Sequence, residues 1–155
     1  MRKSLVTGYI ALGANLGDAV ATVRRAMDAI GHLPQTQLTR RSSLYRTAPL
    51  DAVGPDYINA VVEISTTLSA PVLLQQLQQL ELDAGRERSY RNAPRTLDLD
   101  LLLYGDAQMQ SPALTIPHPR MAGRAFVLMP LAEIAPLRVS DAQLRHVSRQ
   151  AVVRL

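Results

Sequence analysis

The chain of 155 residues contains no cysteine and no tryptophan, and its aromatic residues are five tyrosines and one phenylalanine. The absence of cysteine excludes disulfides, thiolate zinc sites and cysteine nucleophiles, and it favours neither a reducing nor an oxidising compartment. The P-loop pattern that cradles phosphates in many nucleotide hydrolases is also missing. If the protein binds a nucleotide, other side chains must hold its phosphates.

Long apolar runs are absent too, and none approaches the length of a membrane-spanning helix. The basic start followed by residues 5–12 imitates a signal peptide, but Thr7 and Gly8 interrupt the apolar run. We interpret this segment as a first β-strand and expect a cytoplasmic protein with no membrane partner. The chain has the length of one domain, spanning residues 1–155.

Positive charge is concentrated in one short segment. The formal net charge is +4, and residues 86–95 contain four arginines against one glutamate. A nucleic-acid-binding face would add stacking aromatic residues, which are scarce here, so no nucleic-acid partner is expected. A polyphosphate carried with Mg²⁺ needs arginines for its oxygens and carboxylates for the metal. A solvated, charged loop is the alternative interpretation.

Two aspartates directly follow this basic segment, at the start of an apolar strand. The period of two places Asp98 and Asp100 on one face, followed there by Leu102 and Tyr104, with the leucines at 97, 99, 101 and 103 on the other. Carboxylates at the end of a buried strand must pair with cations or ligate a metal, because burying bare charge costs free energy. A metal site and a structural ion network with Arg95 both remain open.

The order of apolar segments predicts the fold. Strands are expected at 6–12, 38–45, 59–64 and 97–104, and helices begin at the Asp18 cap, near Pro71 and at Arg124. A turn is expected from Gly13 to Gly17. The order strand, helix, strand, strand, helix, strand is typical of an α+β, ferredoxin-like two-layer α/β sandwich with a central, mostly antiparallel sheet.

Of the three histidines, only His118 has a distinctive setting. Pro117 and Pro119 hold it in a rigid segment, and Arg120 and Arg124 follow it. These residue types are common around phosphates. A purely structural proline turn explains the same spacing.

An ordered series of motifs resembles the 6-hydroxymethyl-7,8-dihydropterin pyrophosphokinase family. The similar segments are YIALGANLGD at 9–18, SLYRTAPL at 43–50, DYINA at 56–60, LE at 80–81, GR at 85–86, PRTLDLD at 94–100 and LTIPHPRM at 114–121. The resemblance extends from about residue 8 to 136. It implies transfer of pyrophosphate from ATP to 6-hydroxymethyl-7,8-dihydropterin, giving AMP and the pterin diphosphate in folate biosynthesis.

The resemblance also implies roles for particular residues. Asp98 and Asp100 would hold two Mg²⁺ ions, with ATP as co-substrate, and Arg86 and Arg95 would join them in catalysis. The implied ATP-binding residues are Gln78, Glu81, Arg86, Arg88, Arg95, Thr115, His118 and Arg124. The implied pterin-binding residues are Thr47, Ala48, Leu50, Tyr57, Asn59 and Phe126. Asn92 and Ala113 depart from residues found in some relatives.

Two other classes share the predicted topology. An RNA-binding module would place aromatic residues on its central strands, and a ligand-sensing domain would not need converging aspartates and arginines. The assay that separates the three is AMP formation from MgATP and the pterin. We expect the protein to act as a monomer.

Overall fold

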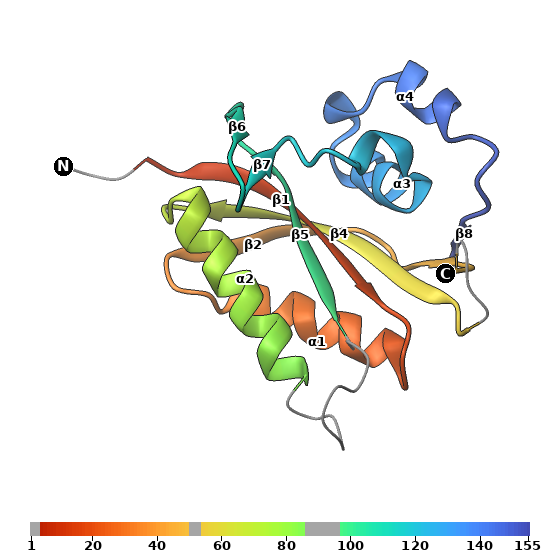
Figure 1. Ribbon diagram of the computed structural model, residues 1–155, viewed down its shortest axis with the longest axis horizontal. Helices are drawn as coiled ribbons and strands as arrows, with labels where there is room; N and C mark the ends of the chain where they lie inside the picture. Colours follow the sequence, from red (N-terminus) through yellow and green to blue (C-terminus); the bar gives the residue numbers. More distant parts are fainter. Residues whose placement is uncertain (1–3, 50–53, 86–96) are drawn as a thin grey trace.

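The computed structural model describes residues 4–49, 54–85 and 97–155, and these form one mixed α/β sandwich (Figure 1). The main elements are β1 (Val6–Ala14), α1 (Ala19–Gly31), β2 (Thr36–Arg41), β3 (Tyr45–Thr47), β4 (Tyr57–Thr66), α2 (Ala70–Gly85) and β5 (Asp98–Tyr104). They are followed by β6 (Met109–Gln110), β7 (Thr115–Ile116), a 3₁₀ turn (Met121–Gly123), α3 (Ala125–Ile134), a second 3₁₀ turn (Pro136–Arg138), α4 (Asp141–His146) and β8 (Val153–Arg154).

The strand order confirms the ferredoxin-like prediction. The main sheet runs β5-β1-β4-β3-β8, with β2 also paired to β4, and every pairing in it is antiparallel. The two long central strands, β1 and β4, therefore each have partners on both sides. A meander cannot produce this order, because β5 returns to the far side of β1 after α2.

The two faces of the sheet pack against different helices (Figure 1). On one face α1 and α2 enclose a core that includes Ile10, Leu12, Leu73 and Leu77. On the other face α3 covers a second core, which includes Leu128 and Leu131 of α3 and Val61 and Leu102 of the strands. Because both faces are covered within the described residues, this sheet offers no open platform of the kind an RNA-binding module of this topology would need.

The predicted strand at 38–45 is wrong, because the structure divides it into β2 and β3. Ser42 causes the break: its backbone N–H donates to the Val61 carbonyl, and its hydroxyl accepts from the Val61 N–H, both at 2.9 Å. A side chain thus replaces a backbone partner at this point of the ladder, and β2 also shifts register between Leu38 and Arg40. The break lets β3 pair with the part of β4 that carries the pocket described below.

The two sandwich helices begin as their residue types predict. Asp18 caps α1, since its carboxylate accepts from the Ala21 N–H at 3.1 Å, and Gly17 precedes it with φ +58°. Pro71 lies in the first turn of α2. The expected turn at Gly13 is wrong in its start, because β1 continues through Ala14.

A bulge changes the faces of β5. Tyr9 of β1 pairs with Leu103 while Ile10 pairs with Leu101, so Leu102 is an extra residue. The prediction that Leu103 shares a face with Leu99 and Leu101 is therefore wrong: Leu102 and Leu103 both pack in the α3 core. Tyr104, predicted on the aspartate face, lies on the α2 face, where its hydroxyl donates to the Leu68 carbonyl at 2.6 Å.

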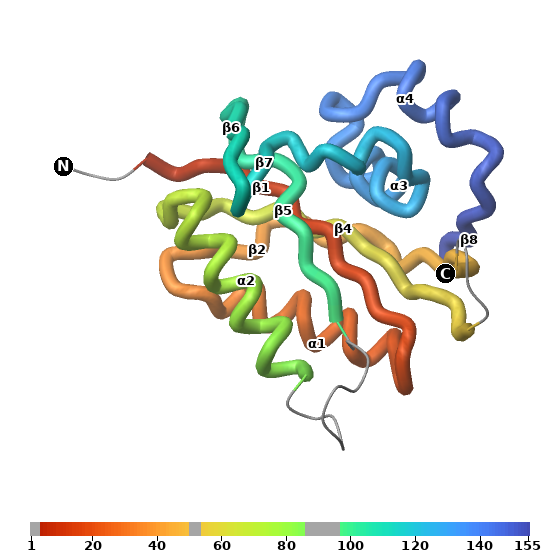
Figure 2. Tube along the Cα trace, viewed as in Figure 1, coloured from red at the N-terminus to blue at the C-terminus, as the bar shows by residue number. Residues whose placement is uncertain are grey.

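The last residues return to the sheet (Figure 2). After α4 the chain passes α3 and adds β8 to the edge of β3. Across the described ranges, no helix combines the length and apolar character required to cross a lipid bilayer.

Candidate functional site

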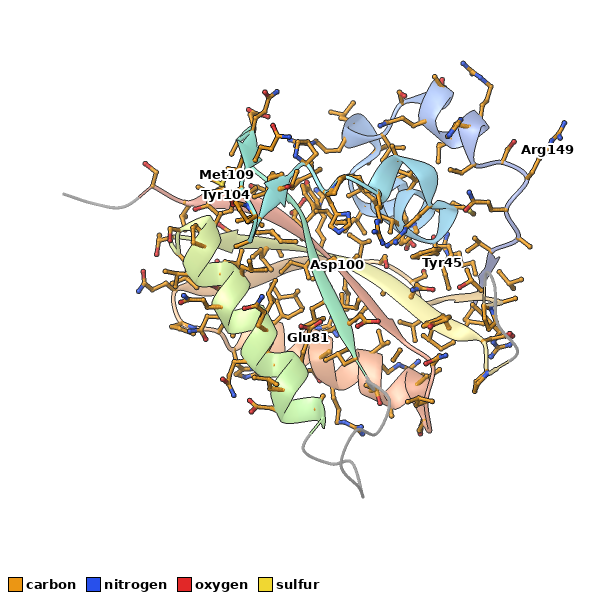
Figure 3. All side chains as sticks on the ribbon, viewed as in Figure 1. Tyr45, Glu81, Asp100, Tyr104, Met109 and Arg149 are labelled. Carbon is orange, nitrogen blue, oxygen red and sulfur yellow. The ribbon has the colours of Figure 1, made fainter. Side chains whose placement is uncertain are left out.

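The predicted carboxylate pair lies at the first residues of β5. Asp98 is exposed and Asp100 half-buried, while the intervening Leu99 is buried in the opposite core, so both acids share the α3 face as predicted. Glu81 of α2 helps to hold this end of the strand, because its carboxylate accepts from the Leu99 N–H at 2.8 Å. Figure 3 labels Asp100 and Glu81 on these two elements.

Asp98 and Asp100 line a pocket of about 270 Å³, which we call the sheet pocket. It lies between the sheet and the start of α3. Its lining residues are Ala11, Leu12, Gly13, Thr47, Ala48, Tyr57, Asn59, Asp98, Asp100, Arg124, Phe126 and Val127. Five of the six residues predicted to bind a pterin therefore meet in one cavity, although they come from separate parts of the chain.

Asn59 is the most constrained polar group of the sheet pocket. It is buried, and its Oδ1 accepts a hydrogen bond from the Thr47 hydroxyl at 3.0 Å. Its Nδ2 lies over Gly13 so closely that a Cβ on that glycine would be 3.0 Å away. With Oδ1 oriented by Thr47, the amide presents a defined donor and acceptor edge, which suits a flat heterocycle with alternating donors and acceptors.

Two aromatic side chains and one arginine complete the sheet pocket. Tyr57 and Phe126 are half-buried and line it from β4 and α3. The Arg124 guanidinium lies 5.5 Å from the centre of the Phe126 ring. Aromatic faces bind planar rings through stacking, and a cation over one of them adds an electrostatic attraction.

A second pocket of about 220 Å³ lies on the other side of Asp100, and we call it the β7 pocket. Its lining residues are Leu74, Leu99, Asp100, Leu101, Pro112, Ala113, Leu114, Thr115, His118 and Pro119. Thr115 and His118, both predicted to bind ATP, therefore lie together here with Ala113. Asp100 lines both pockets, so a group bound in one would approach a group bound in the other beside this carboxylate.

His118 faces Asp100 with its Nε2 3.8 Å from the carboxylate oxygen. Burial lowers the pKa of His118 below 6.5, as do the charges of Arg124 and Arg120, against the opposing effect of Asp100. Its Nδ1 accepts from the Arg120 N–H at 3.2 Å, so the neutral ring carries its proton on Nε2. The His118 backbone N–H donates to the Leu102 carbonyl, which fixes the segment to β5.

Other predicted residues lie outside the pocket expected for them or outside the described residues. Gln78 is exposed on α2 and lines neither pocket, and Glu81 contacts β5 instead. Arg124 lines the sheet pocket and not the β7 pocket. The predictions for Leu50, Arg86, Arg88 and Arg95, and the departure at Asn92, lie outside the described residues.

Gly13 is the lining residue whose role sequence reasoning missed. A glycine inside a strand signals close approach of another group, and that signal was present. Because Gly13 was expected in a turn, its position inside a strand was not predicted. Ala11 and Val127 carried no signal beyond their apolar character.

The donor set around Asp98 and Asp100 fits Mg²⁺. Carboxylates are hard oxygen ligands, and Mg²⁺ commonly uses one or two of them together with phosphate oxygens and water. The described residues contain no cluster of three or more histidine, cysteine, aspartate or glutamate side chains that could hold a metal by themselves. A metal held by these two carboxylates would take further ligands such as phosphate oxygens or water.

Comparison with known proteins identifies related sequences. A sequence model of the family described as 7,8-dihydro-6-hydroxymethylpterin-pyrophosphokinase (HPPK) matches residues 9–136. The chain is 48% identical over 132 residues to the 2-amino-4-hydroxy-6-hydroxymethyldihydropteridine pyrophosphokinase of Haemophilus influenzae, covering 84% of this chain and 82% of that relative. It is 45% identical over 137 residues to the enzyme of the same name from Pseudomonas aeruginosa, covering 87% and 85%.

Solved structures are similar in fold. The HPPK-DHPS protein of Plasmodium falciparum superposes with a TM-score of 0.68 at 13% identity, over 87% of this chain and 40% of that chain. At that identity the similarity supports the fold alone. The longer chain in that structure extends well beyond the matched domain.

Proposed function

Since this chain belongs to the 7,8-dihydro-6-hydroxymethylpterin-pyrophosphokinase family, we propose that its sheet pocket binds the pterin and its β7 pocket lies on the ATP side. The reaction of the enzyme is transfer of pyrophosphate from ATP to 6-hydroxymethyl-7,8-dihydropterin in folate biosynthesis. The observation that carries the two-pocket assignment is that Asp100 lines both cavities. The reacting oxygen of one substrate and the phosphates of the other would meet there.

The chemistry of the sheet pocket suits a pterin. Tyr57 and Phe126 offer ring faces, and Asn59 offers an amide whose orientation Thr47 fixes. A bicyclic pterin presents alternating donors and acceptors along its edge, which a buried amide can read. We propose that the ring lies against Tyr57 and Phe126 and that its hydroxymethyl group points toward Asp98 and Asp100.

The phosphates meet positive charge and donors near Asp100. We propose that Asp98 and Asp100 hold Mg²⁺, and that two ions bind because both carboxylates face the same side. When bound, Mg²⁺ would neutralise phosphate charge. His118 directs its Nε2–H toward this region, and Thr115 offers a hydroxyl in the same pocket. Arg124 extends over Phe126 beside the carboxylates and adds a fixed positive charge. We also propose that Arg86, Arg88 and Arg95 contact the phosphates.

We further propose that one copy of the chain suffices for the reaction. The described residues predicted to bind the pterin already meet in one cavity of a single folded chain, next to the pocket that holds Thr115 and His118. Dependence on ATP favours a cytoplasmic location. We treat residues 1–155 as one pyrophosphokinase domain, because one sheet carries both cores.

The test is product identity. Incubation with MgATP and 6-hydroxymethyl-7,8-dihydropterin should yield AMP in amounts equal to the pterin diphosphate, whereas omission of the pterin should abolish AMP formation. Formation of ADP would indicate transfer of a single phosphoryl group and contradict the proposal. AMP formation that did not depend on the pterin would contradict it as well.

A further inference from the structure

The C-terminal segment, residues 147–155, lies beyond the 9–136 region that matches the family, and its sequence carries no recognisable motif. In the structure it nevertheless contacts the start of α3 through Gln150 and adds β8 to the edge of β3, and Figure 1 shows β8 at that edge. Val147 anchors its beginning, since it is 3% exposed in the core beneath α3. The segment is therefore part of the fold.

Gln150 makes the first contact, at the start of α3. Its Oε1 accepts from the Ala125 N–H at 2.9 Å, and its Nε2 donates to the Gly123 carbonyl at 2.9 Å. These two backbone groups flank Arg124. One side chain from the C-terminal segment thus holds the backbone on either side of a residue that lines the sheet pocket.

This contact replaces a cap that α3 lacks locally. Arg124 occupies the N-cap position, but its side chain makes no capping hydrogen bond. The first N–H groups of a helix have no partner within the helix, so an acceptor must come from elsewhere. Gln150 supplies it, while the Arg124 guanidinium lies over Phe126. The pocket can therefore keep an arginine where an N-cap serine or aspartate would be usual.

The second contact is on the opposite wall, at β3. In β8, Arg154 pairs with Tyr45 of β3. Its guanidinium also reaches Glu133 at 3.2 Å and the Ser43 hydroxyl at 3.0 Å. Because β3 ends at Thr47, which orients Asn59, the segment is attached at both walls of the cavity.

We propose that Gln150 is a positioning residue for the pterin: through the backbone around Arg124 it holds Phe126 and the guanidinium against the sheet pocket. This inference rests on the proposed assignment of that pocket. Without the two hydrogen bonds, the start of α3 samples conformations in which Phe126 is misplaced. The apparent affinity then falls in proportion to the fraction of molecules with a formed pocket.

The experiment compares Gln150→Met, which keeps side-chain length but loses both hydrogen bonds, with Arg149→Ala. Arg149 is the exposed neighbour of Gln150, and its side chain points away from the protein (Figure 3). For Gln150→Met we expect the KM for the pterin to rise about 5-fold, with a smaller change in the KM for ATP and in kcat. Arg149→Ala should change each parameter less than about 2-fold. Calorimetric titration with 6-hydroxymethylpterin should show the same loss of affinity without turnover.

A double-mutant cycle separates positioning from a general loss of stability. If Gln150 acts through Phe126, then adding Gln150→Met to Phe126→Ala should weaken pterin binding no further. Equal losses in both backgrounds, or an unchanged KM for the pterin in Gln150→Met, would overturn the inference. Asn59→Ala serves as the reference: if it weakens pterin binding and Gln150→Met does not, only the role of Gln150 fails. If neither variant affects pterin binding, the pocket assignment itself fails.

Discussion

Gly13→Ala should impair pterin binding while leaving the fold intact, because the added methyl group meets a single neighbour. The ideal Cβ position is 3.0 Å from the Asn59 Nδ2, and among the described residues, apart from Gly13 and its chain neighbours, no other heavy atom lies within 4 Å. An ordinary contact is several tenths of an ångström longer, so the amide must move. Its movement strains the 3.0 Å hydrogen bond that the Thr47 hydroxyl donates to Asn59.

The magnitude follows from the groups involved. The displaced amide loses two hydrogen bonds to the pterin, one that its edge would donate and one that it would accept, and each contributes about 1 kcal/mol. Together these predict a loss of about 2 kcal/mol in binding, or roughly 30-fold in Kd. The free energy of unfolding should change by less than about 1 kcal/mol, because alanine also restricts the unfolded chain.

Gly8→Ala is the matched control on the same strand. A Cβ at Gly8 would lie 3.3 Å from the Ile64 Cγ1 and 3.4 Å from the Leu103 carbonyl oxygen, in the opposite core. We expect it to destabilise the fold by about 1 kcal/mol through overpacking and to leave pterin affinity unchanged. Binding is measured by calorimetric titration with 6-hydroxymethylpterin, and stability by urea unfolding. An unaltered Kd in Gly13→Ala would refute the assignment of Asn59 to pterin binding.

Three further predictions address the carboxylates, the aromatic wall and an acidic side chain remote from the reaction. Asp98→Asn and Asp100→Asn should each lower kcat by about 100-fold or more in the AMP assay. The control Asp106→Asn, just beyond the other end of β5, should leave kcat unchanged. Near-normal turnover in Asp98→Asn or Asp100→Asn would exclude the metal assignment. Phe126→Leu should raise the KM for the pterin about 5-fold through loss of ring stacking, and an unchanged KM would place the pterin elsewhere. Burial opposes ionisation of Glu133, but hydrogen bonds from Tyr45 and Ser43 and the charge of Arg154 outweigh it and lower the pKa of Glu133 below 4.5. The contribution of the ionised Glu133 to stability is therefore present above pH 4.5. It is lost as the pH falls through the lower pKa of the folded state. Thermal melts of the wild type and Glu133→Gln should therefore converge in acid, and a constant difference in Tm down to about pH 3 would contradict this.

The sequence alone was enough to predict the fold class and the family. Local signals such as the Asp18 cap and the Pro71 helix start act over a few residues, so no tertiary information was needed to place α1 and α2. The common face of Asp98 and Asp100 follows from the period of a strand, and the structure confirms it. The motif series identified the family and the residues that meet in the sheet pocket.

Local reasoning failed where a partner far along the chain decides the backbone. The bulge at Leu102 depends on how β5 meets β1, and it reversed the faces expected for Leu103 and Tyr104. The break between β2 and β3 depends on the hydrogen bonds between Ser42 and Val61 of β4. Neither partner can be read from the residues that flank these positions.

The sequence by itself thus determined which residue types the site has and which of them share a strand face. Only the tertiary structure decided that Asp100 separates two pockets, that the Asn59 amide lies against Gly13, and that Gln150 caps α3 from the end of the chain. The physical reason is distance along the chain. Periodicity and capping are properties of a few consecutive residues, whereas these contacts join segments that only the packed sheet brings together.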